Sequence, residues 1–222
     1  MATRWERNWF SHPVLDRVEL HHSVCGKPFR PEMRCDHCHE EVRLEDASYR
    51  PGPGATRDLR ETKVRRRSSI STSQIPSERA LYRNLINLVG DRWTANIIAL
   101  SFHGITRFDA FHRELPVATN ILSDRLRLLV EEGVFEQHVY QERPRRMEYR
   151  LTEKGRDLFP WVLALLQWGD TWCDPEGRGR PMLVVHERCG ELLGASARCS
   201  ECGGHLLAHE VEFTLDGEAL RA

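Results

Sequence analysis

Residues 119–151 read TNILSDRLRLLVEEGVFEQHVYQERPRRMEYRL, and this stretch decides the fold. Its first part predicts an amphipathic helix over residues 119–132, ended by Gly133. The apolar positions that recur at helical spacing are Leu122, Leu126 and Leu129. Two strand-like runs follow, residues 134–140 and 147–151, and in the second run apolar and charged side chains alternate. The stretch therefore predicts a helix followed by a β-hairpin whose turn lies around Pro144.

The flanking sequence adds helices on both sides of this stretch. Helical spacing of leucines predicts a helix over residues 78–89, and apolar side chains predict a second over 94–103. A short third helix begins after a Thr106 cap and stops at Pro116. Downstream, Thr152 caps a helix over residues 153–172. This order of elements is that of a winged helix-turn-helix, in which the third and fourth helices form the helix-turn-helix and the hairpin is the wing.

The fourth helix presents polar side chains on the face opposite its leucines. Such side chains form hydrogen bonds to base edges when a helix enters the major groove. The alternative is an ordinary solvated helix face, and the helix-turn-helix context favours recognition. The candidate DNA-binding residues on this helix are Thr119, Asn120, Ser123, Asp124 and Arg127.

The hairpin turn carries three arginines around Pro144, namely Arg143, Arg145 and Arg146. Guanidinium groups on a hairpin tip suit phosphates or a narrow minor groove, although such a turn can also be a solubilising loop. Residues 77–173 carry 13 Lys and Arg against 13 Asp and Glu, so DNA binding would depend on where the charges lie.

Several motifs resemble the HxlR-type family of winged-helix transcriptional regulators. They are Leu88-Val-Gly-Asp-Arg-Trp93, Arg107-Phe-Asp-Ala-Phe111, Leu122-Ser-Asp-Arg-Leu126 and Tyr149-Arg-Leu-Thr-Glu-Lys-Gly155. The resemblance implies a regulator that binds double-stranded DNA as a homodimer. The last helix, residues 153–172, is apolar on most sides, and in the family such helices pack across a two-fold axis. We therefore expect it to form the dimer contact, while an ordinary core helix is the alternative.

Two runs outside this domain share one cysteine and histidine pattern. His22-x-x-Cys25 is followed by Cys35-x-x-Cys38, and His186-x-x-Cys189 is followed by Cys199-x-x-Cys202 at the same spacing. Three thiolates and one imidazole form a tetrahedral zinc set, so each run predicts its own structural zinc ribbon. A redox-active dithiol or a degenerate relic is the alternative. The one cysteine outside the pattern, Cys173, is expected to be a buried small hydrophobe.

The repeat divides the chain into four parts. We expect residues 1–48 to be the tail of a first repeat whose winged helix is absent, with a short strand at Val42 and Leu44. Residues 49–76 are a basic, Ser-rich linker, residues 77–173 the winged helix-turn-helix, and residues 174–222 the second zinc-ribbon-like module. The fold class is thus mainly α (α+β), a winged helix-turn-helix flanked by two small Cys/His modules that hold up to two zinc ions per chain.

Composition narrows the function further. The formal net charge is −1, and no apolar stretch is long enough to span a membrane, which favours a cytoplasmic protein. The four positions of each metal set are filled by protein ligands, so we expect no catalytic metal, no catalytic residues and no enzyme activity. A DNA-binding transcriptional regulator is the function that the sequence favours. The alternative is a zinc-ribbon protein-interaction module without DNA readout.

Overall fold

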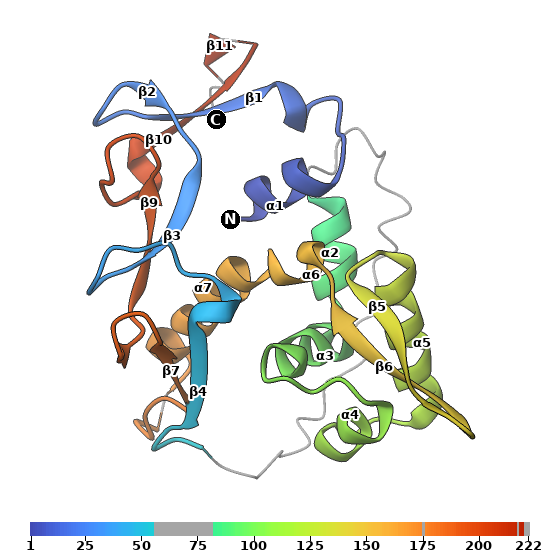
Figure 1. Cartoon of the computed structure of the whole chain (residues 1–222). Coiled ribbons are helices and arrows are strands. Elements are labelled where there is room, and N and C mark those ends of the chain that lie inside the picture. Colours follow the sequence, from blue (N-terminus) through green and yellow to red (C-terminus); the bar gives the residue numbers. More distant parts are fainter. Residues whose placement is uncertain (56–81, 175, 217, 220–222) are drawn as a thin grey trace. The chain divides into compact units, whose positions relative to one another are not determined.

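The structure is a computed structural model that describes residues 1–55, 82–174, 176–216 and 218–219 (Figure 1). The chain divides into two compact units. We call residues 43–45 and 84–163 the helical unit, and residues 1–42, 46–83 and 164–222 the ribbon unit. Among the described residues, no helix is both long enough and apolar enough to cross a lipid bilayer.

The helical unit is a winged helix-turn-helix, as predicted. Its elements in chain order are α2 (Arg83–Val89), α3 (Arg92–Phe102), α4 (Phe108–Glu114), α5 (Thr119–Glu131), β5 (Phe135–Glu142), β6 (Arg145–Leu151), α6 (Glu153–Arg156) and the first part of α7 (Phe159–Trp172). Each helix turns its apolar residues inward. The fully buried side chains include Ile97, Ile98, Phe111, Leu122, Leu126, Leu129 and Leu158. This core fixes α5, whose polar face then lies in solvent.

Local sequence signals explain where these helices begin and end. The side chain of Asp91 caps α3 and accepts hydrogen bonds from the backbone N–H groups of Trp93 and Thr94, both at 3.1 Å. Gly133 takes a positive φ of 68° just after α5. The cap of α4 differs from the prediction, because Arg107 and not Thr106 occupies the N-cap position, without a capping side-chain bond. Residues 78–81 of the predicted first helix lie outside the described residues.

The predicted helix over residues 153–172 is in fact two helices. The hydroxyl of Thr152 accepts from the backbone N–H of Gly155 at 3.2 Å, which confirms the predicted cap of α6. The break falls just before Phe159-Pro160. A proline ring disfavours helical backbone in the preceding residue and lacks an N–H, so Pro160 is accommodated only in the first turn of a new helix.

The ribbon unit consists of α1 (Ala2–Trp9), the last part of α7 and three small antiparallel sheets. One sheet has the strand order β11-β10-β1-β2, the second pairs β3 with β9, and the third has the order β4-β7-β8. The strands are β1 (Val18–His22), β2 (Lys27–Pro28), β3 (Pro31–Cys35), β4 (Ala47–Pro51), β7 (Met182–His186), β8 (Glu191–Leu192), β9 (Ala195–Cys199), β10 (Val211–Leu215) and β11 (Glu218–Ala219). Its described residues also form 3-10 turns over Leu15–Arg17 and Ala208–Glu210, and a further 3-10 turn, Leu44–Asp46, lies at its boundary with the helical unit.

This arrangement corrects the prediction of two separate modules, residues 1–48 and residues 174–222. Each sheet joins the N-terminal run to the C-terminal run, through β1 with β10, β3 with β9, and β4 with β7 (Figure 1). Strands this short bury too little surface to be stable alone, so each run covers the other. The two runs therefore build one body.

Three smaller expectations also change. Val42 and Leu44 form no strand; the strand of this segment is β4, which takes up residues 49–51 of the predicted linker. Residues 56–76 of that linker lie outside the described residues. Cys173 is exposed, because it follows the end of α7 rather than packing against a core.

Candidate metal centres and nucleic-acid interface

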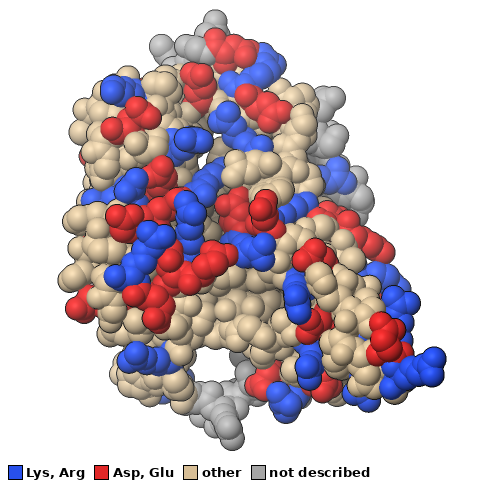
Figure 2. Space-filling model, in the orientation of Figure 1, with Lys and Arg blue, Asp and Glu red and all other residues tan. Residues whose placement is uncertain are grey.

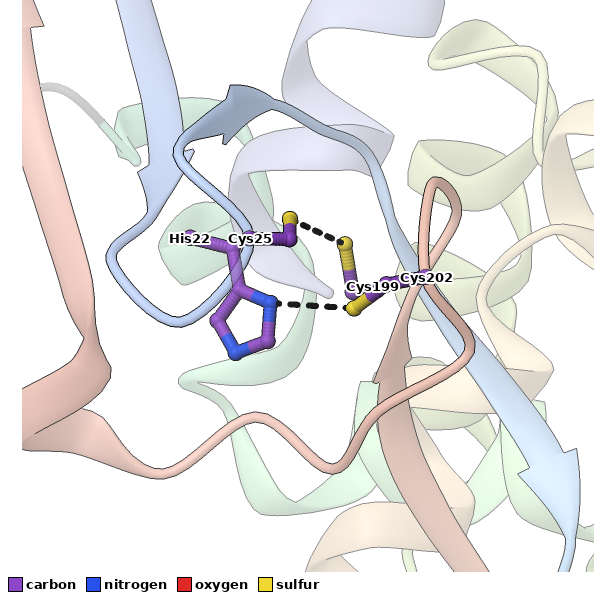
Figure 3. Close-up of side chains that lie close together, drawn as sticks. All are labelled: His22, Cys25, Cys199 and Cys202. Atoms are coloured by element: carbon purple, nitrogen blue, oxygen red, sulfur yellow. Dashed lines mark hydrogen bonds between the residues drawn. The ribbon is translucent and has the colours of Figure 1, made fainter.

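The first metal centre combines ligands from both ends of the chain. His22 ends β1 and Cys25 lies in the turn after it, whereas Cys199 ends β9 and Cys202 lies in the following turn (Figure 3). The Sγ atoms of Cys25 and Cys199 are 3.9 Å apart, and the Cys202 Sγ is 3.3 Å from the His22 Nδ1. The four ligand atoms lie within 4.8 Å of one another.

The second centre repeats this arrangement with the two runs exchanged. It comprises Cys35, Cys38, His186 and Cys189, again within 4.8 Å. The Cys38 Sγ lies 3.3 Å from the His186 Nδ1, and the Sγ atoms of Cys35 and Cys189 are 4.0 Å apart. All eight predicted ligands are thus brought together, but not in the predicted sets. Each centre takes its His-x-x-Cys pair from one run and its Cys-x-x-Cys pair from the other.

The donor sets fit a zinc ion. Three sulfur ligands and one imidazole nitrogen match a closed tetrahedral site with no position left for substrate. Among the described residues, the buried Nε2 atoms of His22 and His186 have no hydrogen-bond partner. The carboxylate of Glu210 lies 3.9 Å from the His22 Nε2, the side of the ring away from the sulfurs, where carboxylates commonly orient metal-bound histidines.

Both centres rest on the same backbone turns. The backbone N–H of Gly26 donates to the His22 carbonyl at 2.8 Å, and Gly190 donates to His186 at the same distance. Gly203 closes the Cys199 knuckle with a φ of 69°. In the other knuckle His39 takes the same conformation, with a φ of 63°, although its side chain makes this backbone unfavourable.

The thiol groups are not equivalent. Burial raises the pKa of Cys35 and of Cys199 above the usual range of a thiol. The pKa of Cys202 is lowered to about 7, first by a hydrogen bond from the backbone N–H of Gly204. A metal ion must therefore displace protons from the two buried thiols when it binds.

The candidate DNA-binding residues of α5 all lie in solvent. Thr119, Asn120, Ser123, Asp124 and Arg127 are exposed, while Leu122, Leu126 and Leu129 of the same helix are buried. Asp124 accepts a hydrogen bond from the Arg127 guanidinium at 2.7 Å, so the two side chains form a pair on the exposed face. The neighbouring Arg125 turns away from that face and forms an ion pair with Asp91 at 3.0 Å.

The hairpin of β5 and β6 places Arg143, Arg145 and Arg146 at its exposed tip, where basic side chains gather in Figure 2. Within the described part of the chain, none of the three guanidinium groups has an intramolecular ion pair. The hairpin is also held by one backbone and one side-chain contact that the sequence did not indicate. Tyr149 donates to the Thr106 carbonyl at 2.7 Å, and the Arg107 guanidinium lies 4.3 Å from the centre of the Tyr140 ring.

Comparison with known proteins identifies the family. A family model described as HxlR-like helix-turn-helix matches residues 88–177. The uncharacterized HTH-type transcriptional regulator Rv3095 of Mycobacterium tuberculosis is 43% identical over 126 residues, which are 57% of this chain and 79% of the relative. The chain belongs to the HxlR-like helix-turn-helix family. It is therefore a DNA-binding transcriptional regulator.

Two further similarities agree with this assignment. The uncharacterized HTH-type transcriptional regulator YvaP of Bacillus subtilis is 35% identical over 95 residues, which are 42% of this chain and 88% of the relative. The crystal structure of PA1607 superposes with a TM-score of 0.52 at 35% identity, and the match covers 63% of this chain and 95% of that one. Nearly all of that shorter chain thus corresponds to a part of this regulator.

One apolar surface of the regulator is uncovered. Along the last part of α7, Leu165, Trp168 and Trp172 are exposed to 48%, 59% and 73% and lie at helical spacing. Large exposed apolar side chains in one stripe are typical of a protein interface. The helix is thus not an ordinary core helix over its whole length.

Proposed function

We propose that this regulator reads duplex DNA with α5 in the major groove. The observation that carries the proposal is the division of α5 into a buried leucine face and an exposed polar face. Asn120 lies in its first turn, where a recognition helix meets base edges, and Arg127 lies two turns further along. Asn and Arg side chains form bidentate hydrogen bonds with adenine and guanine edges.

The wing supplies the phosphate contacts in this proposal. Its three exposed arginines form no ion pair with any residue that the structure describes, so they can bind a phosphate backbone without first breaking such a pair. The rest of the protein is less suited to this role. The described residues of the ribbon unit carry 12 Lys and Arg against 18 Asp and Glu, an acidic balance that repels DNA. This balance supports DNA binding by the helical unit and a structural role for the ribbon unit.

We further propose a homodimer that forms through the 153–172 segment, with the apolar stripe of α7 at the contact. A dimer would present two recognition helices to the two halves of a palindromic site, and it would bury Trp168 and Trp172. It would also compensate for the balanced net charge of the helical unit, because two weak contacts on one DNA molecule reinforce each other.

Zinc completes the proposal as a structural cofactor, with up to two ions per chain. The ions would be held by the two mixed ligand sets, and each would join the N-terminal run to the C-terminal run. The protein would act in the cytoplasm, where a chromosomal operator is accessible and cysteines remain reduced.

The decisive experiment is selection of an operator from random duplexes, followed by fluorescence anisotropy with the selected site. Asn120→Ala and Arg127→Ala should each weaken specific binding by about 1–3 kcal/mol and leave non-specific binding nearly unchanged. A matched control is Arg113→Ala, which also removes an exposed arginine of the helical unit but not from α5. Equal affinity of all variants for the selected site would refute readout by α5 and favour a protein-interaction module.

A further inference from the structure

The two runs of the ribbon unit pair as if they belonged to two molecules. His22 and His186 are 164 residues apart, and the same offset relates every ligand of the first run to its equivalent in the second. The offset also relates the strands, since β1 corresponds to β7, β3 to β9 and β4 to β10. The short hairpins β1–β2 and β7–β8 pair within their own runs. The longer strands β1, β3 and β4, however, each pair with a strand of the other run.

The registers show that this pairing is symmetric. Val18 pairs with Leu215, and Pro51 pairs with Met182, which is the same pair with the two runs exchanged. In the central pair of strands, Met33 faces Ala197, its own equivalent. A residue that faces its equivalent marks a local two-fold axis, and a two-fold interface is one that a surface forms with a second copy of itself.

We propose that residues 18–51 occupy, within one chain, the place of the tail of a second copy of this chain. The surface that residues 182–215 present to the first run is therefore self-complementary, and its natural partner is another 182–215 segment. In such a tail–tail pair, His186 and Cys189 of one molecule complete a metal centre with Cys199 and Cys202 of the other. This inference concerns the ribbon unit alone and does not depend on how the helical unit reads DNA.

The first run has acquired contacts that favour the internal pairing. Met33 at the axis is only 3% exposed, and a tail–tail pair would place the smaller Ala197 there. Arg17 donates from Nε to Asp216 at 2.8 Å, whereas a second tail would offer Pro181 in its place. A carboxylate oxygen of Asp36 lies 3.6 Å from a guanidinium nitrogen of Arg198. The equivalent of Asp36 in the second run is the uncharged Ser200.

One consequence concerns the number of DNA-reading domains. An internal pair carries a single helical unit for two metal centres, whereas a tail–tail pair carries two helical units for the same two centres. The first run thus prevents the ribbon surface of this chain from joining two molecules.

Complementation between two full-length variants tests the proposal. In both variants the first run is disabled, because its four metal ligands are replaced by alanine and the buried Met33 at the axis is replaced by a charged residue. Variant P also lacks one half of the second run, and variant Q lacks the other half. The shared substitutions are His22→Ala, Cys25→Ala, Met33→Asp, Cys35→Ala and Cys38→Ala; variant P adds His186→Ala and Cys189→Ala, and variant Q adds Cys199→Ala and Cys202→Ala.

Neither variant alone retains a four-ligand set, so neither should hold zinc against a competing chelator. Their mixture should hold one zinc ion per P–Q pair, seen by native mass spectrometry, because P supplies the Cys-x-x-Cys pair and Q the His-x-x-Cys pair. The unaltered chain, with two ions, is the positive control. A mixture that holds no more zinc than its components would overturn the proposal, provided that both variants keep the thermal transition of the helical unit.

A second measurement remains decisive if either variant fails to fold. A labelled peptide of residues 182–215 is titrated with zinc into the full chain that carries only the five shared substitutions. The peptide should bind this chain in the presence of zinc and be released by a chelator. It should bind the unaltered chain at least tenfold more weakly, because the first run already covers the surface. Binding that ignores zinc, or equal binding to both chains, would contradict the proposal.

Discussion

Replacement of Arg145 and Arg146 by alanine should change the salt dependence of DNA binding more than it changes sequence preference. Both guanidinium groups lie at the exposed tip of the β5–β6 hairpin and have no intramolecular ion pair among the described residues. Each arginine that neutralises a phosphate adds about 0.9 to the slope of log affinity against log salt. The double variant should therefore show a slope lower by about 1.8.

The size of the effect follows from this slope. Between 50 and 200 mM salt, a fourfold change, a slope difference of about 1.8 corresponds to a difference of about 12-fold in the affinity lost. The unaltered protein should thus weaken about 12-fold more than the variant over this range, for specific and non-specific duplexes alike. Fluorescence anisotropy at four or five salt concentrations measures both slopes.

The matched control is Arg178→Ala with Arg180→Ala. It removes two exposed arginines as well, but from the acidic ribbon unit, where Glu176 and Asp170 lie beside them. The control should keep the slope of the unaltered protein. An identical slope in the wing variant and the control would refute phosphate contact by the wing.

Three other changes test separate parts of the structure. Asp124→Ala frees the Arg127 guanidinium from its partner and removes a negative charge from the DNA-facing side of α5. Non-specific DNA binding should therefore tighten, while the preference for the specific site over non-specific DNA should fall by about 1 kcal/mol in competition assays. An unchanged preference would show that the pair does not orient Arg127. His39→Gly relieves a positive φ and should raise the free energy of unfolding of the zinc-loaded protein by about 1 kcal/mol in denaturant titration. The converse change, Gly203→His, should lower this free energy. Equal stability of both variants and the unaltered protein would contradict the strain at His39. Zinc affinity should fall as the pH falls, because the pKa values of Cys35 and Cys199 are raised and zinc binding must release their protons. Titration calorimetry in buffers of different ionisation enthalpy should therefore give a heat of binding that depends on the buffer. A heat that is the same in all buffers would exclude proton release.

The helical unit was predictable because its signals are local. Leu122, Leu126 and Leu129 select the buried face of α5 within a few turns of one helix. The alternation in residues 147–151 correctly places Leu151 in the core and Arg150 in solvent, but Glu148, predicted on the solvent face, is buried and accepts a hydrogen bond from Arg150. The division of the last helix required only the rule that proline belongs in a first turn, applied at Pro160. Each of these signals involves residues close together in the sequence, so it can be recognised from the sequence alone.

The pairing of the two runs was not predictable from spacing. A His-x-x-Cys pair has the same geometry whether its sulfur and nitrogen meet the Cys-x-x-Cys pair of its own run or that of the other. The choice is made by strand pairing across more than 150 residues, for example between Met33 and Ala197. The one relevant signal in the sequence is the repeat itself, because two copies of one self-complementary surface in one chain can pair with each other.

The roles of single polar residues needed the structure as well. Nothing in the spacing of residues 119–132 distinguishes Arg125, which binds Asp91 beneath the helix, from Arg127, which lies on the exposed face. The one relevant signal was the position of Asp91 as the N-cap of α3, because the same carboxylate also binds Arg125 and so anchors α5.

The exchange of metal ligands between the two runs is tested most directly by the zinc content of two matched double variants, measured by native mass spectrometry after incubation with a competing chelator. Each variant replaces two cysteines by serine. Cys25→Ser with Cys199→Ser removes two ligands of one centre and leaves the other complete, so it should retain one zinc ion per chain. Cys25→Ser with Cys35→Ser removes one ligand from each centre and should retain none. The reverse result, with one ion in the second variant and none in the first, would show that each run binds its own zinc and would contradict the exchanged ribbon.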